Sequence, residues 1–264
     1  MNTAKRIAFI GLGAMGEPMA ERLIDAGFTV TSCANRNRDA IERLAAKGLV
    51  ECTTAGEAAK DADVFISIVF DEEQNDQVLR GDSGALAALS PGSTIVLMST
   101  ISPSYCQDLA KEATERGINV LDCPVSGRVE GAVAGTLTLM VGGDESVIAR
   151  CAEVFSAMGN ALRCGDVGAG QLTKVANNTL FISTFALLQE LREVIESYGM
   201  DFKQFIEVLN QSTGRSWVSE NVGIPRQRVA LPEMPIKDLG IGRDLASELS
   251  IDVPLIKQVL EHGK

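Results

Sequence analysis

The sequence predicts an α/β fold, in which a doubly wound parallel sheet is followed by a smaller all-helical domain. Two observations predict it. Through residue 165, short apolar runs alternate with stretches of helical period, which is typical of a parallel sheet covered on both faces. From Gly168 onward the pattern is helical almost to the end of the chain. We therefore expect one domain at residues 1–165 and a second at residues 166–264.

The first domain begins with a regular alternation of strands and helices. The expected strands are 6–10, 28–34, 64–69, 93–98 and 119–122, followed by 136–141 and 161–164. Helical spacing of apolar residues predicts helices at 15–26, 39–47, 74–79, 103–116 and 145–158. Asp144 is a suitable N-cap for the last of these helices, because its carboxylate can accept from the first free N–H groups.

The second domain opens with an unusually long predicted helix, at 172–198. It exceeds the usual three or four turns, and a helix of this length can connect two domains. Four shorter helices are expected after it, at 201–210, 216–221, 237–249 and 253–262. Apolar faces on such helices need cover, so we expect a homo-oligomer, a dimer or a tetramer.

Composition excludes several classes of function. The chain has 264 residues and a formal charge of −11, which disfavours nucleic acid and anionic membranes as partners. No stretch approaches the roughly 18 apolar residues of a membrane span. The six cysteines form no CxxC pair and the single histidine is His262, so we expect no metal site, reduced thiols and a cytoplasmic location.

A glycine motif follows the first predicted strand directly and opens a predicted helix. Gly11 permits a tight turn, Gly13 lets a pyrophosphate approach the backbone, and Gly16 lets the helix pack closely on the strand. The helix N-terminus offers N–H groups and a partial positive charge to phosphates. The motif therefore predicts a Rossmann-type dinucleotide site, with the whole turn in contact with the cofactor: Gly11, Leu12, Gly13, Ala14, Met15 and Gly16.

The end of the second predicted strand indicates which dinucleotide is bound. An NAD site usually places Asp or Glu there, whereas the stretch 33–38 of this chain contains no acid, and the first one after the strand is Asp39. Asn35 can bond a ribose oxygen, and Arg36, with Arg38 as a further candidate, can hold a 2′-phosphate as a planar fork. We predict NADP over NAD, with NAD possible; the alternative is that these arginines form a solvated helix start.

A lysine stands near the start of the long predicted helix. Lys174 shares a helix face with Asn177 and Asn178, three and four residues further on. A lysine beside a nicotinamide ring can act as a general acid–base, giving a proton to a carbonyl oxygen or taking one from a hydroxyl. The alternative is an ordinary surface lysine on an amphipathic helix.

Five motifs in order resemble the β-hydroxyacid dehydrogenase family, which includes 3-hydroxyisobutyrate dehydrogenase, tartronate semialdehyde reductase and the glyoxylate/succinic semialdehyde reductases. They lie at residues 11–20, 99–103, 122–127 with its continuation to 137, 168–178 and 237–239. One departure is Arg128, where the family often has a small residue; it could contact a carboxylate, narrow the pocket or face solvent.

The resemblance implies roles for residues of this chain. Lys174 would be the catalytic acid–base, and the substrate would be held by Ser126, Gly127, Asn177 and Asn178. The cofactor would also be contacted by Thr100 and Lys237, and we add Val69, at the end of a predicted strand, to this set.

The expected function is hydride transfer between NAD(P)H and a small semialdehyde or 2-oxo acid, or the reverse oxidation of a 3-hydroxyacid. Two alternatives stay open. One is an imine reductase on the same scaffold, against which Lys174 argues. The other is a non-catalytic scaffold that binds the cofactor and organises partners.

Overall fold

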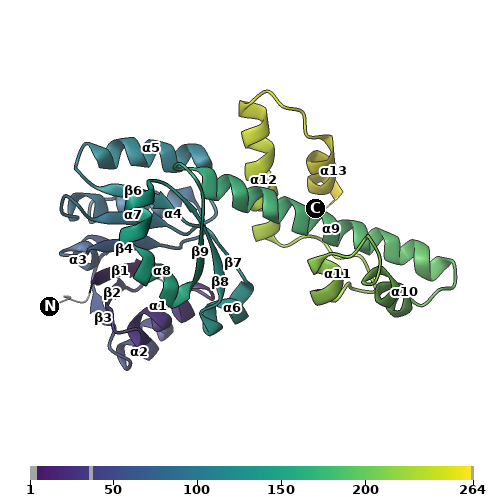
Figure 1. Ribbon diagram of the computed structural model, residues 1–264, viewed down its shortest axis with the longest axis horizontal. Coiled ribbons are helices and arrows are strands. Elements are labelled where there is room, and N and C mark those ends of the chain that lie inside the picture. Colours follow the sequence, from purple (N-terminus) through teal and green to yellow (C-terminus); the bar gives the residue numbers. More distant parts are fainter. Residues whose placement is uncertain (1–4, 36–37, 263–264) are drawn as a thin grey trace. The chain divides into compact units, whose positions relative to one another are not determined.

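The computed structural model describes residues 5–35 and 38–262 (Figure 1). The chain forms two compact units, the first ending at Lys174 and the second beginning at Val175. This division lies inside one long helix. The domain boundary after residue 165 stays a prediction. It is placed where the helical sequence pattern starts, and a sequence pattern does not show where the contacts between residues separate into two units.

The first unit is built on a sheet that runs through its centre (Figure 1). Six strands lie parallel in the order β3-β2-β1-β4-β5-β6. Their bounds are Arg6–Ile10 for β1, Thr29–Cys33 for β2, Val50–Cys52 for β3, Val64–Ser67 for β4, Thr94–Leu97 for β5 and Asn119–Asp122 for β6. The predicted α/β class and Rossmann-type sheet are confirmed.

Six strands of the sheet are parallel, and the sheet becomes mixed at one end. The sheet continues past β6 with β7 (Val125–Ser126), β8 (Leu137–Gly142) and β9 (Gly159–Gly165). β8 runs antiparallel to both β6 and β7, and β9 runs parallel to β8. A parallel return needs a crossover of a dozen or more residues, and the segment between β7 and β8 is too short for one.

Helices cover both faces of the sheet. Their bounds are α1 Gly16–Asp25, α2 Asp39–Ala45, α3 Ala55–Ala59, α4 Glu72–Leu79, α5 Pro103–Thr114, α6 Arg128–Ala134, α7 Glu145–Arg150 and α8 Ala152–Met158, with a 3-10 turn at Ala85–Ala87. The helix predicted at 145–158 is divided at Cys151, where the backbone leaves helical geometry. Asp144 caps α7 as expected, accepting from the N–H groups of Ser146 and Val147.

Alternate residues of each central strand enter opposite cores. In β1, Ile7 and Phe9 belong to a cluster shared with α1 and α8, whereas Ala8 and Ile10 belong to a second cluster shared with α3 and α5. Side chains of a strand point to opposite faces with a period of two, so a strand buried on both faces is apolar throughout. This explains why the strand sequences read as continuous apolar runs.

Over residues 175–262, the regular elements of the second unit are helices (Figure 1). α9 (Ala169–Ser197) begins in the first unit and continues into the second, and α10 (Phe202–Leu209), α11 (Trp217–Asn221), α12 (Glu233–Glu248) and α13 (Pro254–His262) follow. α12 starts before the predicted 237, because Pro235 in a first turn is tolerated. Among the described helices, none is long and apolar enough to cross a membrane.

Candidate functional site

The sheet topology brings four of the predicted positions to one edge. β1, β4, β5 and β6 are parallel neighbours, so the segments that follow them leave the sheet on the same side. Gly11 follows β1, Val69 follows β4 and Thr100 follows β5. Ser126 lies in β7, the short strand that comes after β6. In open α/β sheets, ligands bind at this carboxyl edge.

The glycine turn has the geometry of a phosphate cradle. A Cβ on Gly11 would lie 2.2 Å from the carbonyl oxygen of Ile68, and a Cβ on Gly16 would lie 1.8 Å from the carbonyl oxygen of Gly11. By contrast, a Cβ on Gly13 would meet no atom within 4 Å. Gly11 and Gly16 therefore close the turn, whereas Gly13 keeps open the space that a pyrophosphate needs.

The start of α1 completes that cradle. Leu12 and Met15 pack against the core, and Ala14 is exposed between them. Met15 occupies the N-cap position without a side-chain hydrogen bond to the helix. The first N–H groups of α1 are thus not capped by this side chain, as required of a helix start that receives an anion. The turn fits a dinucleotide.

The segment after β2 carries the residues that would distinguish the two dinucleotides. Asn35 is exposed at the end of this strand, and Arg36 lies outside the described residues. Arg38 forms an ion pair with Glu51 of β3, with nitrogen and oxygen 2.7 Å apart. This carboxylate therefore holds Arg38 in the structure, a pairing that the linear sequence did not indicate.

A buried polar network ties the loops after β4 and β5 together. Asn75, fully buried in α4, donates to the hydroxyl of Ser99 and accepts from that of Ser67. The Ser99 hydroxyl in turn accepts from the backbone N–H of Val69 at 2.9 Å. The predicted cofactor contacts Val69 and Thr100 therefore lie in two loops joined through one serine. Sequence reasoning identified the motif at 99–103 but missed this role of Ser99.

The substrate signature lies on a short strand and the turn after it. Ser126 is half-buried in β7, where it pairs with Thr138 of β8. Gly127 is exposed and has a φ of 138°, a value that favours glycine. Arg128 follows with a φ of 59° and lies exposed, 3.8 Å from Glu130. The Ser126 hydroxyl and the Gly127 N–H are adjacent, which suits binding of a carboxylate.

The start of α9 is held by a buried carboxylate. Asp122, at the end of β6, accepts from the backbone N–H groups of Gly168 at 2.6 Å and of Gln171 at 2.7 Å. Burial raises the pKa of Asp122, although these hydrogen bonds act in the opposite direction. A Cβ on Gly142 or on Gly170 would lie within 3 Å of its carboxylate oxygens. The carboxylate thus fits a space that these two glycines create.

Lys174 lies one turn beyond Gln171 and is half-buried, and it is the last residue of the first unit. In the second unit, the side-chain amide of Asn178 donates to Asp238 at 2.6 Å and accepts from the amide of Asn177 at 3.2 Å. Asp238 is buried, and Lys237 lies 3.6 Å from its second oxygen. Sequence reasoning missed Asp238; the signal available was an acid inside the motif at 237–239.

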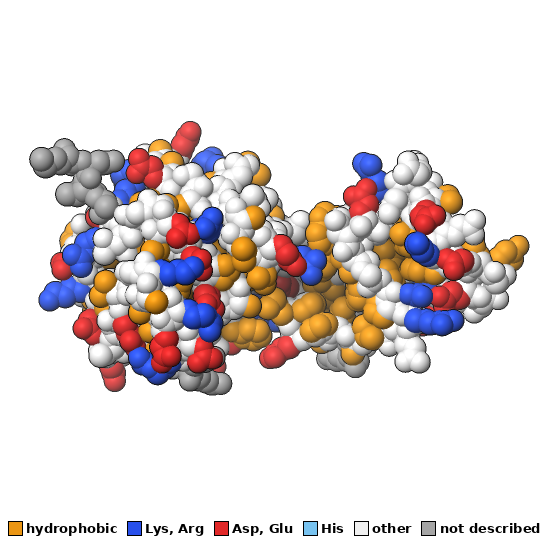
Figure 2. All heavy atoms as spheres, turned by 90° about the horizontal axis from the view of Figure 1, so that it is seen from below, with side chains coloured by type: hydrophobic (Ala, Val, Ile, Leu, Met, Phe, Trp, Pro, Cys, Tyr) orange, Lys and Arg blue, Asp and Glu red, His pale blue; other side chains and the backbone are white. Residues whose placement is uncertain are grey.

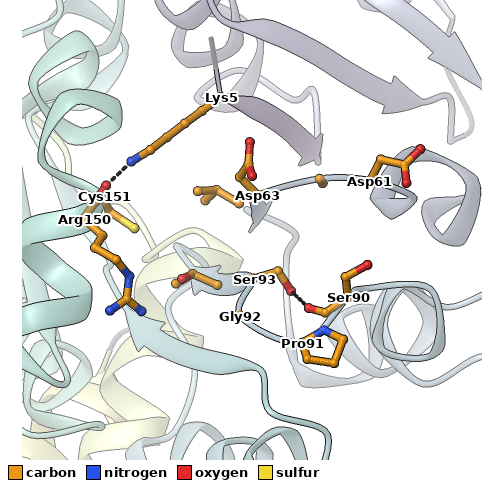
Figure 3. A pocket seen from close by; sticks show the side chains of 12 residues that line it. Lys5, Asp61, Asp63, Ser90, Pro91, Gly92, Ser93, Arg150 and Cys151 are labelled. Atoms are coloured by element: carbon orange, nitrogen blue, oxygen red, sulfur yellow. Dashed lines mark hydrogen bonds between the residues drawn. The ribbon is translucent and has the colours of Figure 1, made fainter. Parts of the chain in front are cut away.

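A cavity of about 430 Å³ in the first unit lies away from these residues. It is lined by the segments that precede β1, β4 and β5, so it opens at the amino edge of the sheet (Figure 3). Lys5 donates to the Arg150 carbonyl, and Ser93 donates to the Ser90 carbonyl at 2.7 Å. The lining of the cavity includes two cations, Lys5 and Arg150, and two carboxylates, Asp61 and Asp63, so its charges are mixed. The cradle for a dinucleotide lies at the opposite edge.

A Rossmann-type unit with an open glycine turn, followed by a helical unit, defines a dinucleotide-dependent oxidoreductase. Comparison with known proteins specifies the family. The family model described as the NAD-binding domain of 6-phosphogluconate dehydrogenase matches residues 6–168. The model described as NAD-binding of NADP-dependent 3-hydroxyisobutyrate dehydrogenase matches residues 168–262. The chain belongs to the β-hydroxyacid dehydrogenase family, and is an NAD(P)-dependent hydroxyacid dehydrogenase.

Relatives agree with this assignment over nearly the whole chain. The NAD-dependent L-serine dehydrogenase of Pseudomonas aeruginosa is 34% identical, with 95% of this chain and 88% of the relative covered. The 2-(hydroxymethyl)glutarate dehydrogenase of Eubacterium barkeri is 32% identical, with 100% and 91% covered. The structure of Mycobacterium tuberculosis 3-hydroxyisobutyrate dehydrogenase with L-serine has a TM-score of 0.87 at 31% identity, with 98% and 92% covered. An imine reductase of Myxococcus stipitatus, 21% identical, shares the fold.

Proposed function

We propose that this protein interconverts a small 3-hydroxyacid and its semialdehyde or 2-oxo acid with NADP(H) preferred, and that Lys174 is the general acid–base. The observation that supports it best is the place of Lys174 on α9. Lys174 is half-buried, and the turn before it is hydrogen-bonded to the loop of Thr100 and to the end of β6. A lysine on a helix start that is fixed in this way can serve as a positioned proton donor and acceptor.

The chemistry divides between the cofactor and this chain. A bound nicotinamide would supply or accept the hydride, and the glycine turn, Val69, Thr100 and Lys237 would hold the dinucleotide. In the reducing direction the Lys174 ammonium gives its proton to the substrate carbonyl oxygen. In the oxidising direction the neutral amine takes the hydroxyl proton.

Substrate binding is assigned to two pairs of neighbouring residues. The Ser126 hydroxyl and the Gly127 N–H would bind the carboxylate. Asn178, with Asn177 beside it, would orient the substrate oxygen, because Asp238 accepts one N–H of the Asn178 amide and a second N–H is available to donate. These assignments suit a small carbonyl compound that carries a carboxylate as substrate. They do not distinguish one such acid from another.

The decisive test is the Lys174→Ala variant. We expect it to lose more than ~10²-fold of kcat, the low end for removing a general acid, while NADPH binding stays nearly intact. The assay is NADPH oxidation over glyoxylate, succinic semialdehyde, methylmalonate semialdehyde and tartronate semialdehyde. Near-normal turnover by Lys174→Ala rejects the assignment. Turnover of a cyclic imine, with none of an aldehyde acid, favours an imine reductase; NADPH binding without turnover favours a scaffold.

The preference for NADP is supported by the lack of an acid at the end of β2, where Asn35 is exposed. Comparing kcat/KM for NADPH and NADH tests it, and a tenfold advantage for NADH overturns it. Asn35→Asp supplies the acid typical of NAD sites, so it should shift the ratio towards NADH. Lys47→Gln is the matched control, because it also lowers the charge of an exposed position by one, and that amine is paired with Glu21 of α1.

Two further proposals concern the protein in the cell. A cytoplasmic location is supported by its six cysteines, none of which is in a disulfide. A homo-oligomer is supported by α9, where the exposed Leu180, Leu187 and Val194 recur every seven residues along one helix. Figure 2 shows hydrophobic side chains gathered over part of the helical unit. A second copy of the chain would cover this seam.

A further inference from the structure

Gln171 is a polar residue in a position that hydrophobic residues usually occupy. Its side chain is 0% exposed at the start of α9. A buried amide costs free energy unless its donor and acceptor are both paired. In this structure both are paired with backbone: the amide oxygen accepts from the Ile101 N–H at 3.1 Å, and the amide nitrogen donates to the Ser99 carbonyl at 2.8 Å.

These two partners stand on either side of one residue. Ser99 and Ile101 are the chain neighbours of Thr100, the expected contact to the nicotinamide ribose. The Gln171 amide therefore holds the backbone of the Thr100 loop at both of its peptide links. The same loop is held from the other direction by Asn75, which donates to the Ser99 hydroxyl at 3.1 Å.

The backbone of Gln171 is also fixed. Its N–H donates to the buried carboxylate of Asp122 at 2.7 Å, and Gly168 donates to the other oxygen of that group. The first turn of α9 is thus attached to the end of β6 by its backbone and to the loop after β5 by one side chain. Lys174 stands three residues further, about one helical turn and ~4.5 Å along the axis.

We propose that Gln171 is a positioning residue, which sets the distance between the Lys174 amine and the Thr100 loop for the proton transfer. The inference rests on the proposed function of Lys174. The Gln171 side chain is 0% exposed, and its oxygen and one N–H are paired with backbone, so it is not placed to bind substrate. Its effect on the rate is therefore exerted through the placement of another side chain.

The test uses Gln171→Leu, which keeps much of the volume and removes both hydrogen bonds. A misplacement near 1 Å costs about 10²-fold in rate, so we expect kcat to fall between ~10- and ~100-fold. The Kd for NADPH should stay within about twofold. Thr173→Ala is the matched control, because Thr173 lies in the same turn, is exposed, and donates to the Ala169 carbonyl within the helix. It should keep wild-type kcat.

A double-mutant cycle separates positioning from a general loss of structure. If Gln171 acts through Lys174, Gln171→Leu should cost less than about twofold when added to Lys174→Ala. A full additional loss in that background overturns the proposal, because the amide would then act on something other than the amine. Should Gln171→Leu fail to fold, Gln171→Met, also close in volume and lacking the hydrogen bonds, replaces it in the same cycle.

The cycle also tells the two hypotheses apart. Near-normal turnover by Lys174→Ala removes the proposed function and this inference with it. A strong loss in Lys174→Ala, together with wild-type kcat in a folded Gln171→Leu protein, removes the inference alone.

Discussion

The two units bury their apolar surface to different degrees. In the first, the largest side chains of the sheet and its helices are fully buried, among them Phe9, Phe65 and Phe155. In the second, the cores are small. α9 exposes Leu180 at 71%, Leu187 at 55% and Val194 at 64%, and Tyr198, just after α9, is 90% exposed. The helices of the first unit cover its sheet, whereas α9 in the second unit leaves a row of large apolar side chains exposed.

The predicted site residues differ between the units too. In the first unit they belong mainly to backbone features: strand ends, the glycine turn and N–H groups held by buried polar side chains. In the second unit they are side chains, among them Asn178, which donates to Asp238. We therefore expect variants in the first unit to affect stability and cofactor binding most, and variants in the second to affect substrate binding and assembly.

The largest effect is expected at the glycine turn. Gly16→Ala places a methyl group 1.8 Å from the Gly11 carbonyl oxygen, so the backbone must move. We expect a loss of about 2 kcal/mol of unfolding free energy, measured by urea denaturation. Gly13→Ala is its counterpart: with no atom within 4 Å it should keep wild-type stability but bind NADPH at least ~10-fold more weakly. Equal stability of the two variants would contradict this account.

The next largest effect is expected in the second unit, at the carboxylate that accepts from Asn178. Asp238→Asn replaces the acceptor of the Asn178 amide with a group that can turn its own N–H towards it. We expect the substrate KM to rise about 10-fold, because a buried hydrogen bond to a charged group contributes about 1.5–3 kcal/mol and part of this orients the amide. The KM for NADPH serves as the internal control. An equal rise in both would place Asp238 in the cofactor site.

A third prediction concerns the exposed seam on α9. Leu187→Lys places a charge in the middle of the Leu180, Leu187 and Val194 row. If a second copy covers this face, the variant should dissociate at concentrations where the wild type stays assembled, as measured by sedimentation velocity. Lys257→Gln, at an exposed position on α13 paired with Asp252, is the control. A monomeric wild type would contradict the proposed homo-oligomer.

The smallest effect is expected on the surface of the first unit. The Arg43 guanidinium bonds Glu17 at 2.6 and 2.8 Å and lowers the pKa of that carboxyl. Because the folded pKa lies below the unfolded one, the stabilisation is present at neutral pH and is lost as the pH falls through the folded pKa. Arg43→Gln should lower Tm by no more than about 2 °C at pH 7. The two melting temperatures should converge as the pH falls from the ordinary glutamate pKa, about 4.3, through the lowered folded pKa. A constant gap would indicate a different cause.

Much of the fold was predictable because the central strands are buried on both faces and read as apolar runs. The elements that were missed are short or half-exposed, such as β3 and α3, and carry little periodicity. The helix at 145–158 was predicted as one piece, since a single residue, Cys151, interrupts it without Gly or Pro to mark the break. Local pattern does not encode such interruptions.

The candidate site was predictable to the extent that it lies in local motifs. Glycine spacing identified the turn after β1, and the spacing of Lys174 and Asn178 identified one helix face. Asp122, Gln171 and Asp238 were not assigned roles, because their partners are distant in sequence and nothing local distinguishes a buried polar residue from a solvated one. Only tertiary structure shows that each is paired.

The carboxylate enclosed by Gly142 and Gly170 has an evolutionary consequence. Any larger residue at those glycines would displace Asp122, so this corner tolerates little drift. The side chain of Arg128, by contrast, is exposed and can be replaced without displacing its neighbours. If the turn before it binds the substrate carboxylate as proposed, a lineage could change which acid it recognises at this position while the helix start that carries Lys174 is inherited unaltered.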